Sequence, residues 1–186
     1  MNARSAAIIV MLALASACSG VSPPPRDHRP LGDVMAAPRE CDLISTDAIR
    51  IATGFRDYVA LGTKLGEGRF GSCTVSEDAG DLGLVIEVFD PSPHDAKDLE
   101  RTRKSVRGKN LPAGLSPGFA ARRTGPQGKN IAFVYGWTSD HRRLLSVKIT
   151  EGAAGRDSVA DAVEFFRQLK PVLLDERSGE EAVDVG

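Results

Sequence analysis

The chain has 186 residues, 41% of them hydrophobic and 26% charged, and a formal net charge of −1. These values are ordinary for a globular domain near the modal size. They argue against a nucleic-acid partner, because nucleic-acid binding needs a clustered positive field.

The N-terminus has the layout of a secretory signal that ends at a lipid-acceptor cysteine. Arg4 precedes an apolar run from Ala6 to Ala17, and Cys18 follows the small residues at the end of that run. About 12 apolar residues are too few for a permanent transmembrane helix, which needs about 20. The pattern predicts a signal peptide over residues 1–17. It also predicts lipidation of Cys18 and anchoring to the outer face of the cytoplasmic membrane.

Residues 18–40 are rich in proline and show little apolar periodicity. Proline fixes the backbone φ angle and removes a hydrogen-bond donor. The sequence therefore predicts an extended, semi-rigid tether between the lipid and the folded domain. A single domain is expected over residues 41–175, followed by an acidic, flexible tail over 176–186.

Alternating and helical hydrophobic patterns predict the elements of this domain. Ser45 or Thr46 can cap the first helix, and Ser92 and Ser158 begin the second and third. Residues 55–65 are mixed, and residues 109–117 read as a loop. In chain order, we expect a helix at about 46–53, strands at 70–76 and 82–89, a helix to about 106, strands at 118–123, 130–137 and 142–150, and a helix at 158–174.

Strand groups joined by turns, with helices between the groups, favour an antiparallel sheet covered by helices. The predicted fold class is therefore α+β, with about five strands packed against two to three helices. Phe133, Tyr135 and Trp137 alternate along one strand, which indicates a stripe of packed side chains.

The three cysteines of the chain support export. If Cys18 carries lipid, Cys41 and Cys73 form an even pair that an extracytoplasmic compartment allows to oxidise. Such a bridge would close a loop of about 30 residues and contribute roughly 3 kcal/mol. The alternative is two unrelated buried thiols. A bridge would leave no thiolate in the domain for a metal.

The string from Leu65 to Gly71 resembles the glycine-rich loop of protein kinases. The other kinase motifs are absent: Glu87 stands where the next strand would need a cation, and Asp140-His141-Arg142 has the wrong order for the catalytic loop. The simpler interpretation is a connection into the strand that carries Cys73, with Phe70 in the core.

No set of residues predicts catalysis or metal binding. His28, His94 and His141 lie in three different sequence contexts, whereas a zinc site needs three or four convergent ligands. Gly71-Ser72-Cys73 lacks the second glycine of a nucleophile elbow. A Ser-His-Asp triad assembled from distant segments stays open as an alternative. We expect no cofactor and no metal.

A basic cluster ends the middle helix, and it contains Arg101, Arg103, Lys104, Arg107 and Lys109. Cations at a helix C-terminus complement the helix dipole, which is one interpretation. The other is a patch that faces anionic headgroups or an acidic partner. Arg122, Arg123, Arg142 and Arg143 are candidates for extending that patch.

The string Cys41-Asp42-Leu43-Ile44-Ser45-Thr46, followed by Gly71-Ser72-Cys73, resembles a family of actinobacterial secreted lipoproteins that carry a domain of unknown function. The resemblance implies a bridge between Cys41 and Cys73 and an α+β fold akin to the PsbP-like sandwich. The chain departs from the family pattern at Val75, where an aromatic residue is common, and at Ala15, where leucine is common.

From these patterns we expect a lipid-anchored domain that binds a small ligand or a protein at the cell envelope, without catalytic activity. The alternatives are an envelope hydrolase with an unrecognised triad and a structural or stress-related lipoprotein. The ligand, the partner and the oligomeric state are not specified by these residues.

Overall fold

The computed structural model of the chain describes residues 25–77, 80–125, 128–150 and 152–175. The predicted signal peptide, Cys18 and the predicted tail lie outside the described residues. Within those ranges, none of the helices combines the length and the apolar character that crossing a bilayer requires.

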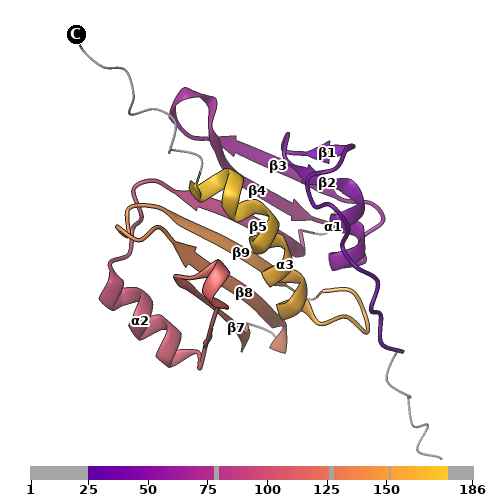
Figure 1. Cartoon of the computed structure of the whole chain (residues 1–186). Helices are drawn as coiled ribbons and strands as arrows, with labels where there is room; N and C mark the ends of the chain where they lie inside the picture. The colour runs from indigo at the N-terminus through magenta and orange to yellow at the C-terminus, as the bar shows by residue number, and fades with distance from the viewer. Residues whose placement is uncertain (1–24, 78–79, 126–127, 151, 176–186) are drawn as a thin grey trace, which may run out of the picture.

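The domain is built on a seven-stranded antiparallel sheet with the order β3-β4-β5-β9-β8-β7-β6 (Figure 1). Its strands are β3 (Val59–Lys64), β4 (Phe70–Ser76), β5 (Leu82–Phe89), β6 (Lys109–Asn110), β7 (Gly118–Thr124), β8 (Asn130–Trp137) and β9 (Leu144–Thr150). A separate two-stranded sheet pairs β1 (Arg39–Glu40) with β2 (Ile44–Ser45). The α+β class is confirmed, with more strands than the five predicted.

The two additional strands of the large sheet are its edges. β3 has little buried surface, and Leu61 in its middle is 64% exposed. β6 has only two residues and pairs with β7. Hydrophobic periodicity does not detect such strands, because their ladder hydrogen bonds define them and their side chains bury little.

Three helices accompany the sheet: α1 (Thr46–Thr53), α2 (Ala96–Ser105) and α3 (Ser158–Lys170). α1 ends at Gly54, whose φ of 78° provides the expected left-handed stop. A π-helical turn (Pro171–Asp175) follows α3. α2 begins later than predicted, at Ala96, because Asp95 and not Ser92 accepts the hydrogen bond of its first turn. α3 begins at Ser158 as predicted, with Asp157 as the residue that accepts the first-turn hydrogen bonds.

The core lies on one face of the sheet, which we call the helix face. α1 contacts β5 and β9 there, and α3 contacts β7, β8 and β9. The opposite face carries a smaller aromatic cluster in which the ring of Phe119 meets those of Phe133, Tyr135 and Trp137 edge-on. The predicted packed stripe on β8 is therefore confirmed, on the face away from α3.

Residues 25–40, which we call the strap, run past α1 and onto α3 (Figure 1). Leu31 and Val34 of the strap are buried in the core. Gln168 of α3 accepts from the backbone N–H of Val34 at 3.0 Å and donates to the carbonyl of Gly32 at 2.8 Å. The prediction of an unpacked tether is thus wrong for residues 25–40, because two apolar side chains without periodicity suffice to anchor the segment.

Candidate functional site

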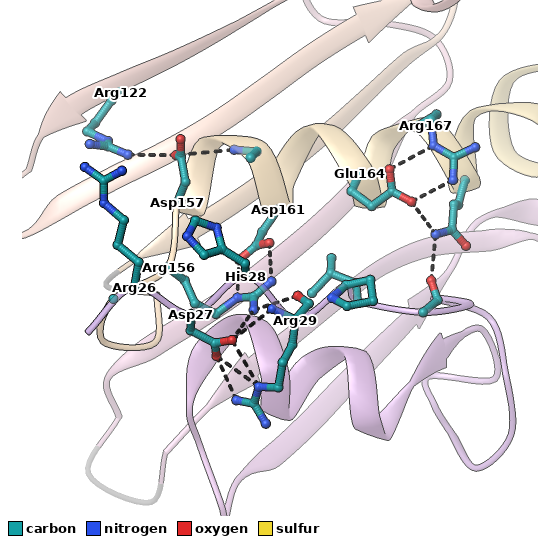
Figure 2. Close-up of a pocket in the computed structure, with 16 residues that line it drawn as sticks. Arg26, Asp27, His28, Arg29, Arg122, Arg156, Asp157, Asp161, Glu164 and Arg167 are labelled. Carbon is teal, nitrogen blue, oxygen red and sulfur yellow. Dashed lines mark hydrogen bonds and ion pairs between the residues drawn. The ribbon is translucent and has the colours of Figure 1, made fainter. Parts of the chain in front are cut away.

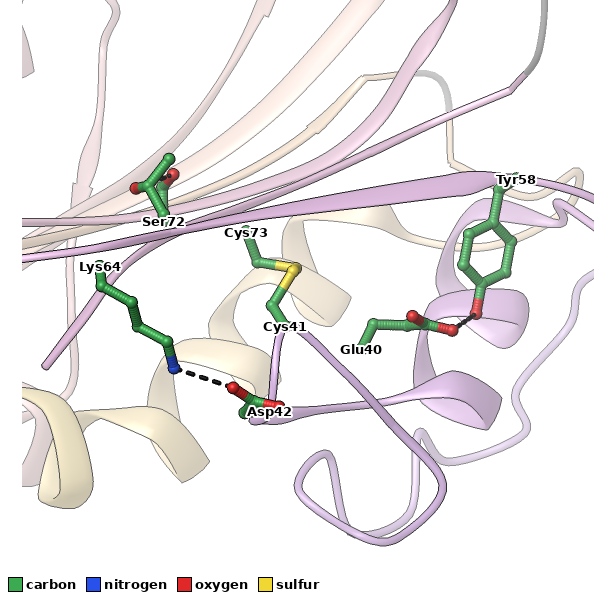
Figure 3. Close-up of a disulfide and its surroundings, with 8 residues drawn as sticks. Glu40, Cys41, Asp42, Tyr58, Lys64, Ser72 and Cys73 are labelled. Carbon is green, nitrogen blue, oxygen red and sulfur yellow. Dashed lines mark hydrogen bonds and ion pairs between the residues drawn. A yellow bond between two sulfur atoms is a disulfide. The ribbon is translucent and has the colours of Figure 1, made fainter. Parts of the chain in front are cut away.

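Cys41 and Cys73 form a disulfide with an S–S distance of 2.06 Å and a Cα–Cα distance of 5.8 Å. The bridge joins the turn between β1 and β2 to the middle of β4 (Figure 3). Gly62 of β3 lies against the bridge, and a Cβ there would stand 3.1 Å from the Cβ of Cys41. The predicted pairing is confirmed, and the close approach explains the glycine at position 62.

A hollow of about 340 Å³ opens beside this bridge, and we call it the disulfide pocket. Its walls come from the turn after β1, the connection between β3 and β4, and the π-helical turn after α3. Its apolar lining consists of Leu43, Leu65, Phe70, Val88, Val172 and Leu173. Three distant segments of the chain therefore meet at a concave apolar surface, which is the usual character of small-molecule sites.

Cationic side chains stand at the mouth of the disulfide pocket. Lys64 donates to Asp42 at 3.0 Å, as Figure 3 shows beside the bridge. Arg69 donates from Nη1 to Asp90 at 2.9 Å and from Nε to the carbonyl of Gly66 at 3.2 Å. The carboxylate of Asp90 is buried, whereas Lys64 and Arg69 reach solvent.

Arg143 is also among the residues that line the pocket. Its Nη1 donates to the carbonyl of Leu174 at 2.8 Å, its Nη2 donates to the carbonyl of Leu173, and its Nε lies 3.8 Å from the carboxylate of Asp90. A guanidinium that binds the last carbonyls of a helical segment holds that segment in place. Arg143 thus positions the turn that supplies Leu173 and Val172 to the pocket wall.

The backbone around the pocket includes left-handed conformations at residues other than glycine. Cys41, Asp42 and Glu67 have φ values of 53°, 63° and 63°. Such conformations cost about 1 kcal/mol or more each for residues with a Cβ, and they occur often at ligand sites. The bridge holds one strained turn, and a 3-10 turn (Gly66–Gly68) contains the other.

The glycine-rich string from Leu65 to Gly71 therefore forms part of the wall of the disulfide pocket. As predicted, it connects into the strand of Cys73, and Phe70 packs against the core.

A second and larger hollow, about 1000 Å³, lies between the strap and α3, and we call it the strap groove (Figure 2). At its floor is Arg156, only 4% exposed, which donates to the two oxygens of Asp161 at 2.7 and 2.8 Å. The same guanidinium lies 3.3 Å from Asp27 and donates to the carbonyl of Arg29 at 2.9 Å. These bonds fasten the start of the strap to the first turn of α3.

Three other arginines that line the strap groove, Arg29, Arg122 and Arg167, are also paired with carboxylates. Arg29 chelates Asp27, and its side-chain and backbone donors hold the pKa of Asp27 well below the usual range. Arg167 binds Glu164 at 2.6 Å and lowers the pKa of that carboxyl in the same way. A ligand in this groove would compete with ion pairs that are already formed, so the groove fits a structural lock better than a binding site.

The basic residues of α2 and the arginines considered as an extension of their patch do not all share a surface. Arg101 and Arg103 bind Asp98 and Glu100 on their own helix, and the latter pair lowers the pKa of Glu100 to about 2. Arg122 lies on the helix face of β7 beside the N-cap of α3, where it donates to Asp157 at 3.0 Å.

The other arginines proposed to extend the patch lie elsewhere. Arg123 stands over the Phe133 ring on the opposite face of β7, with its guanidinium 5.8 Å from the ring centre. Arg143 is largely buried, and Arg142 lines a shallow hollow beside α2. The predicted extension of the patch is therefore wrong, since adjacent residues of a strand point to opposite faces of the sheet.

The three histidines lie in two hollows. His28 lines the strap groove, and His94 and His141 both line the shallow hollow beside α2, which their sequence contexts did not indicate. Among the described residues, no group of three or more His, Cys, Asp or Glu side chains is placed to hold a metal. The ring of His141 stacks on Trp137 instead.

Comparisons of the chain with protein-family models, with curated proteins and with solved structures gave no match.

The sequence predicted the bridge and the connection into the strand of Cys73, but it did not indicate the pocket that both of them line. It also missed the lock made by Arg156, Asp27 and Asp161. The apolar spacing of α3 places Asp161 next to core positions, and a carboxylate at such a position needs a cation, which was the available signal. No local pattern links Asp27 to residues more than a hundred positions away.

Proposed function

We propose that the protein is an exported lipoprotein, anchored through Cys18 to the outer face of the cytoplasmic membrane. Its domain binds a small ligand at the cell envelope and performs no chemistry on it. The alternative within the same proposal is that the domain binds a protein partner and not a small ligand. The resemblance to secreted actinobacterial lipoproteins agrees with this location.

The disulfide pocket is the observation that carries the binding part of the proposal. Its volume of about 340 Å³ lies within the range of small-molecule sites, and its apolar lining has a few polar groups at the mouth. The disulfide supports the extracytoplasmic part, because such bridges persist in oxidising compartments. Arg143 and the bridge hold two of the walls, so the site exists before a ligand enters.

The anchoring is tested by the variant Cys18→Ala in the organism that produces the protein. Without the thiol, no lipid can be attached, and the protein should leave the membrane fraction or accumulate as the uncleaved precursor. Metabolic labelling with a palmitate analogue should mark the unaltered protein and leave the variant unlabelled. Membrane anchoring that is unchanged in the variant and insensitive to globomycin would refute the lipoprotein proposal.

The binding is tested by native mass spectrometry of the protein isolated from the envelope fraction. We expect an additional mass from a bound small molecule, and we expect the variant Val172→Trp to lose it because the indole fills the pocket. Leu61→Trp is the matched control, since Leu61 is exposed on the other face of the sheet. Absence of a bound mass in every preparation, or equal retention by Val172→Trp, would contradict the proposal.

A further inference from the structure

The disulfide pocket separates charge at its mouth from apolar groups at its floor. Val88 and Leu173 are each only 6% exposed and form the floor. Lys64 and Arg69 flank the 3-10 turn (Gly66–Gly68), and their side chains are 48% and 38% exposed. A ligand that fits both parts has an apolar body and a charged group at one end.

The pocket is lined by the carboxylates of Asp42 and Glu67 as well as by cations, and Lys64 and Arg69 are the two exposed cations that can bind an anionic group. Lys64 is paired with Asp42, whose side chain is 85% exposed, and an ion pair so open to solvent contributes at most about 1 kcal/mol. An incoming carboxylate can therefore replace Asp42 at little cost. The ammonium of Lys64 also has three donors, of which Asp42 takes one.

Arg69 offers a second donor at the same mouth. Its Nη1 and Nε bind Asp90 and the carbonyl of Gly66, while its Nη2 makes no hydrogen bond with the described part of the chain. The two existing bonds fix the plane of the guanidinium, so the remaining N–H groups are oriented in advance. Bonds from a guanidinium or an ammonium to a carboxylate are among the stronger hydrogen bonds.

We propose that the disulfide pocket binds a small anionic amphiphile: a carboxylate held by Lys64 and Arg69, with an apolar body against Phe70, Val88 and Leu173. The volume of about 340 Å³ corresponds to roughly eleven water-sized groups, which limits the ligand to about a dozen non-hydrogen atoms. The inference rests on the proposed ligand-binding function and names the class of the ligand.

The test is a calorimetric titration with two probes of the same length, decanoate and decanol. The protein is a secreted form from Ser19 to Gly186, which keeps every described residue, including the whole described core and the bridge. Decanoate should bind at least about tenfold more tightly than decanol. Lys64→Gln and Arg69→Gln should each weaken decanoate binding about tenfold and leave decanol binding unchanged.

Two further variants act as controls. Arg69→Lys keeps the charge without the fixed planar donors and should bind decanoate with an affinity between those of the unaltered protein and Arg69→Gln. Arg101→Gln, on α2 outside the pocket, should have no effect. Equal affinity for decanoate and decanol, with both lost in Val172→Trp, would overturn this inference and leave the ligand-binding proposal standing. Decanoate binding that Val172→Trp does not weaken would overturn the assignment of the site.

Discussion

The strap groove and the disulfide pocket both contain arginines, but these arginines differ in their burial and in how many of their donors are already bound. In the groove, Arg156 is almost fully buried and its donors are taken by two carboxylates and a carbonyl. In the pocket, Arg69 is partly exposed, shares one buried carboxylate with Arg143, and stands next to apolar walls. The groove is about three times larger, at about 1000 Å³ against about 340 Å³.

The comparison shows that the size of a hollow is a poor guide to binding. A ligand gains little where the protein's own charges already satisfy one another, since it must break those pairs before making its own. It gains more where apolar surface is open to water and a few donors point outward. The groove is thus a seam between two parts of the domain, and the pocket is the candidate site.

The largest expected effect on stability comes from removing the disulfide beside the pocket. Replacing both cysteines, as in Cys41→Ser with Cys73→Ser, removes a bridge across 32 positions and should lower the free energy of unfolding by about 3 to 4 kcal/mol. Chemical denaturation measures the loss. Because the bridge also holds the turn of Asp42, binding of the pocket's ligand should weaken even under conditions where the variant is fully folded. Ligand affinity equal to that of the unaltered protein would show that the turn does not need the bridge.

The second effect tests whether the groove is a structural seam. Arg156→Met leaves Asp161, itself buried, without its cation, and we expect a loss of about 3 kcal/mol in the free energy of unfolding. Arg122→Met breaks the exposed pair with Asp157 in the same groove and should cost at most about 1 kcal/mol. Thermal or denaturant unfolding gives both values. Similar losses in the two variants would mean that the burial of an ion pair does not determine how much that pair contributes to stability.

Arg156→Met also tests whether the strap groove and the disulfide pocket are independent of each other. The groove and the pocket share no lining residue, so ligand affinity should stay unchanged in the variant once it is folded. A marked loss of affinity would indicate that the strap and the pocket are coupled through α3 and the π-helical turn.

The smallest effect is a change in the pH dependence of stability. The donors of Arg29 lower the pKa of Asp27, so the stabilisation from that carboxylate is complete above its unfolded pKa of about 4. It is lost as the pH falls through the lower folded value. Asp27→Asn should therefore make the decline in stability below pH 4 shallower, as measured by urea unfolding at several pH values. Parallel profiles for the two proteins would contradict this account of the lock.

Much of the fold was predictable because its inner strands and helices bury one clear face each. β4, β5, β8 and β9 carry alternating or continuous apolar residues, and α1 ends at a glycine with the expected left-handed conformation. The edges of the sheet were not predictable, because they bury little and are defined by pairing alone. The strap was misjudged because its prolines dominate its composition, while only Leu31 and Val34 hold it to the core.

The candidate site was predictable in parts and not as a whole. The count of cysteines indicated the bridge, and the glycine-rich string was recognised as the approach to the strand of Cys73. The pocket needs in addition the side chain of Arg143 and the turn after α3, which lie roughly 70 and 100 residues after Cys73 and share no motif with it. No local pattern shows that such segments meet.

By itself, the sequence determined the inner strands and the helices, the α+β class and the candidate pairing of Cys41 with Cys73, because these depend on local periodicity and the number of thiols. Only the tertiary structure decided that the strap is part of the domain and that Arg122 and Arg123 lie on different faces of the sheet. It also decided that one hollow is crossed by buried ion pairs while the other has an apolar lining. Burial and the pairing of charges are properties of segments brought together in space, which local patterns do not encode.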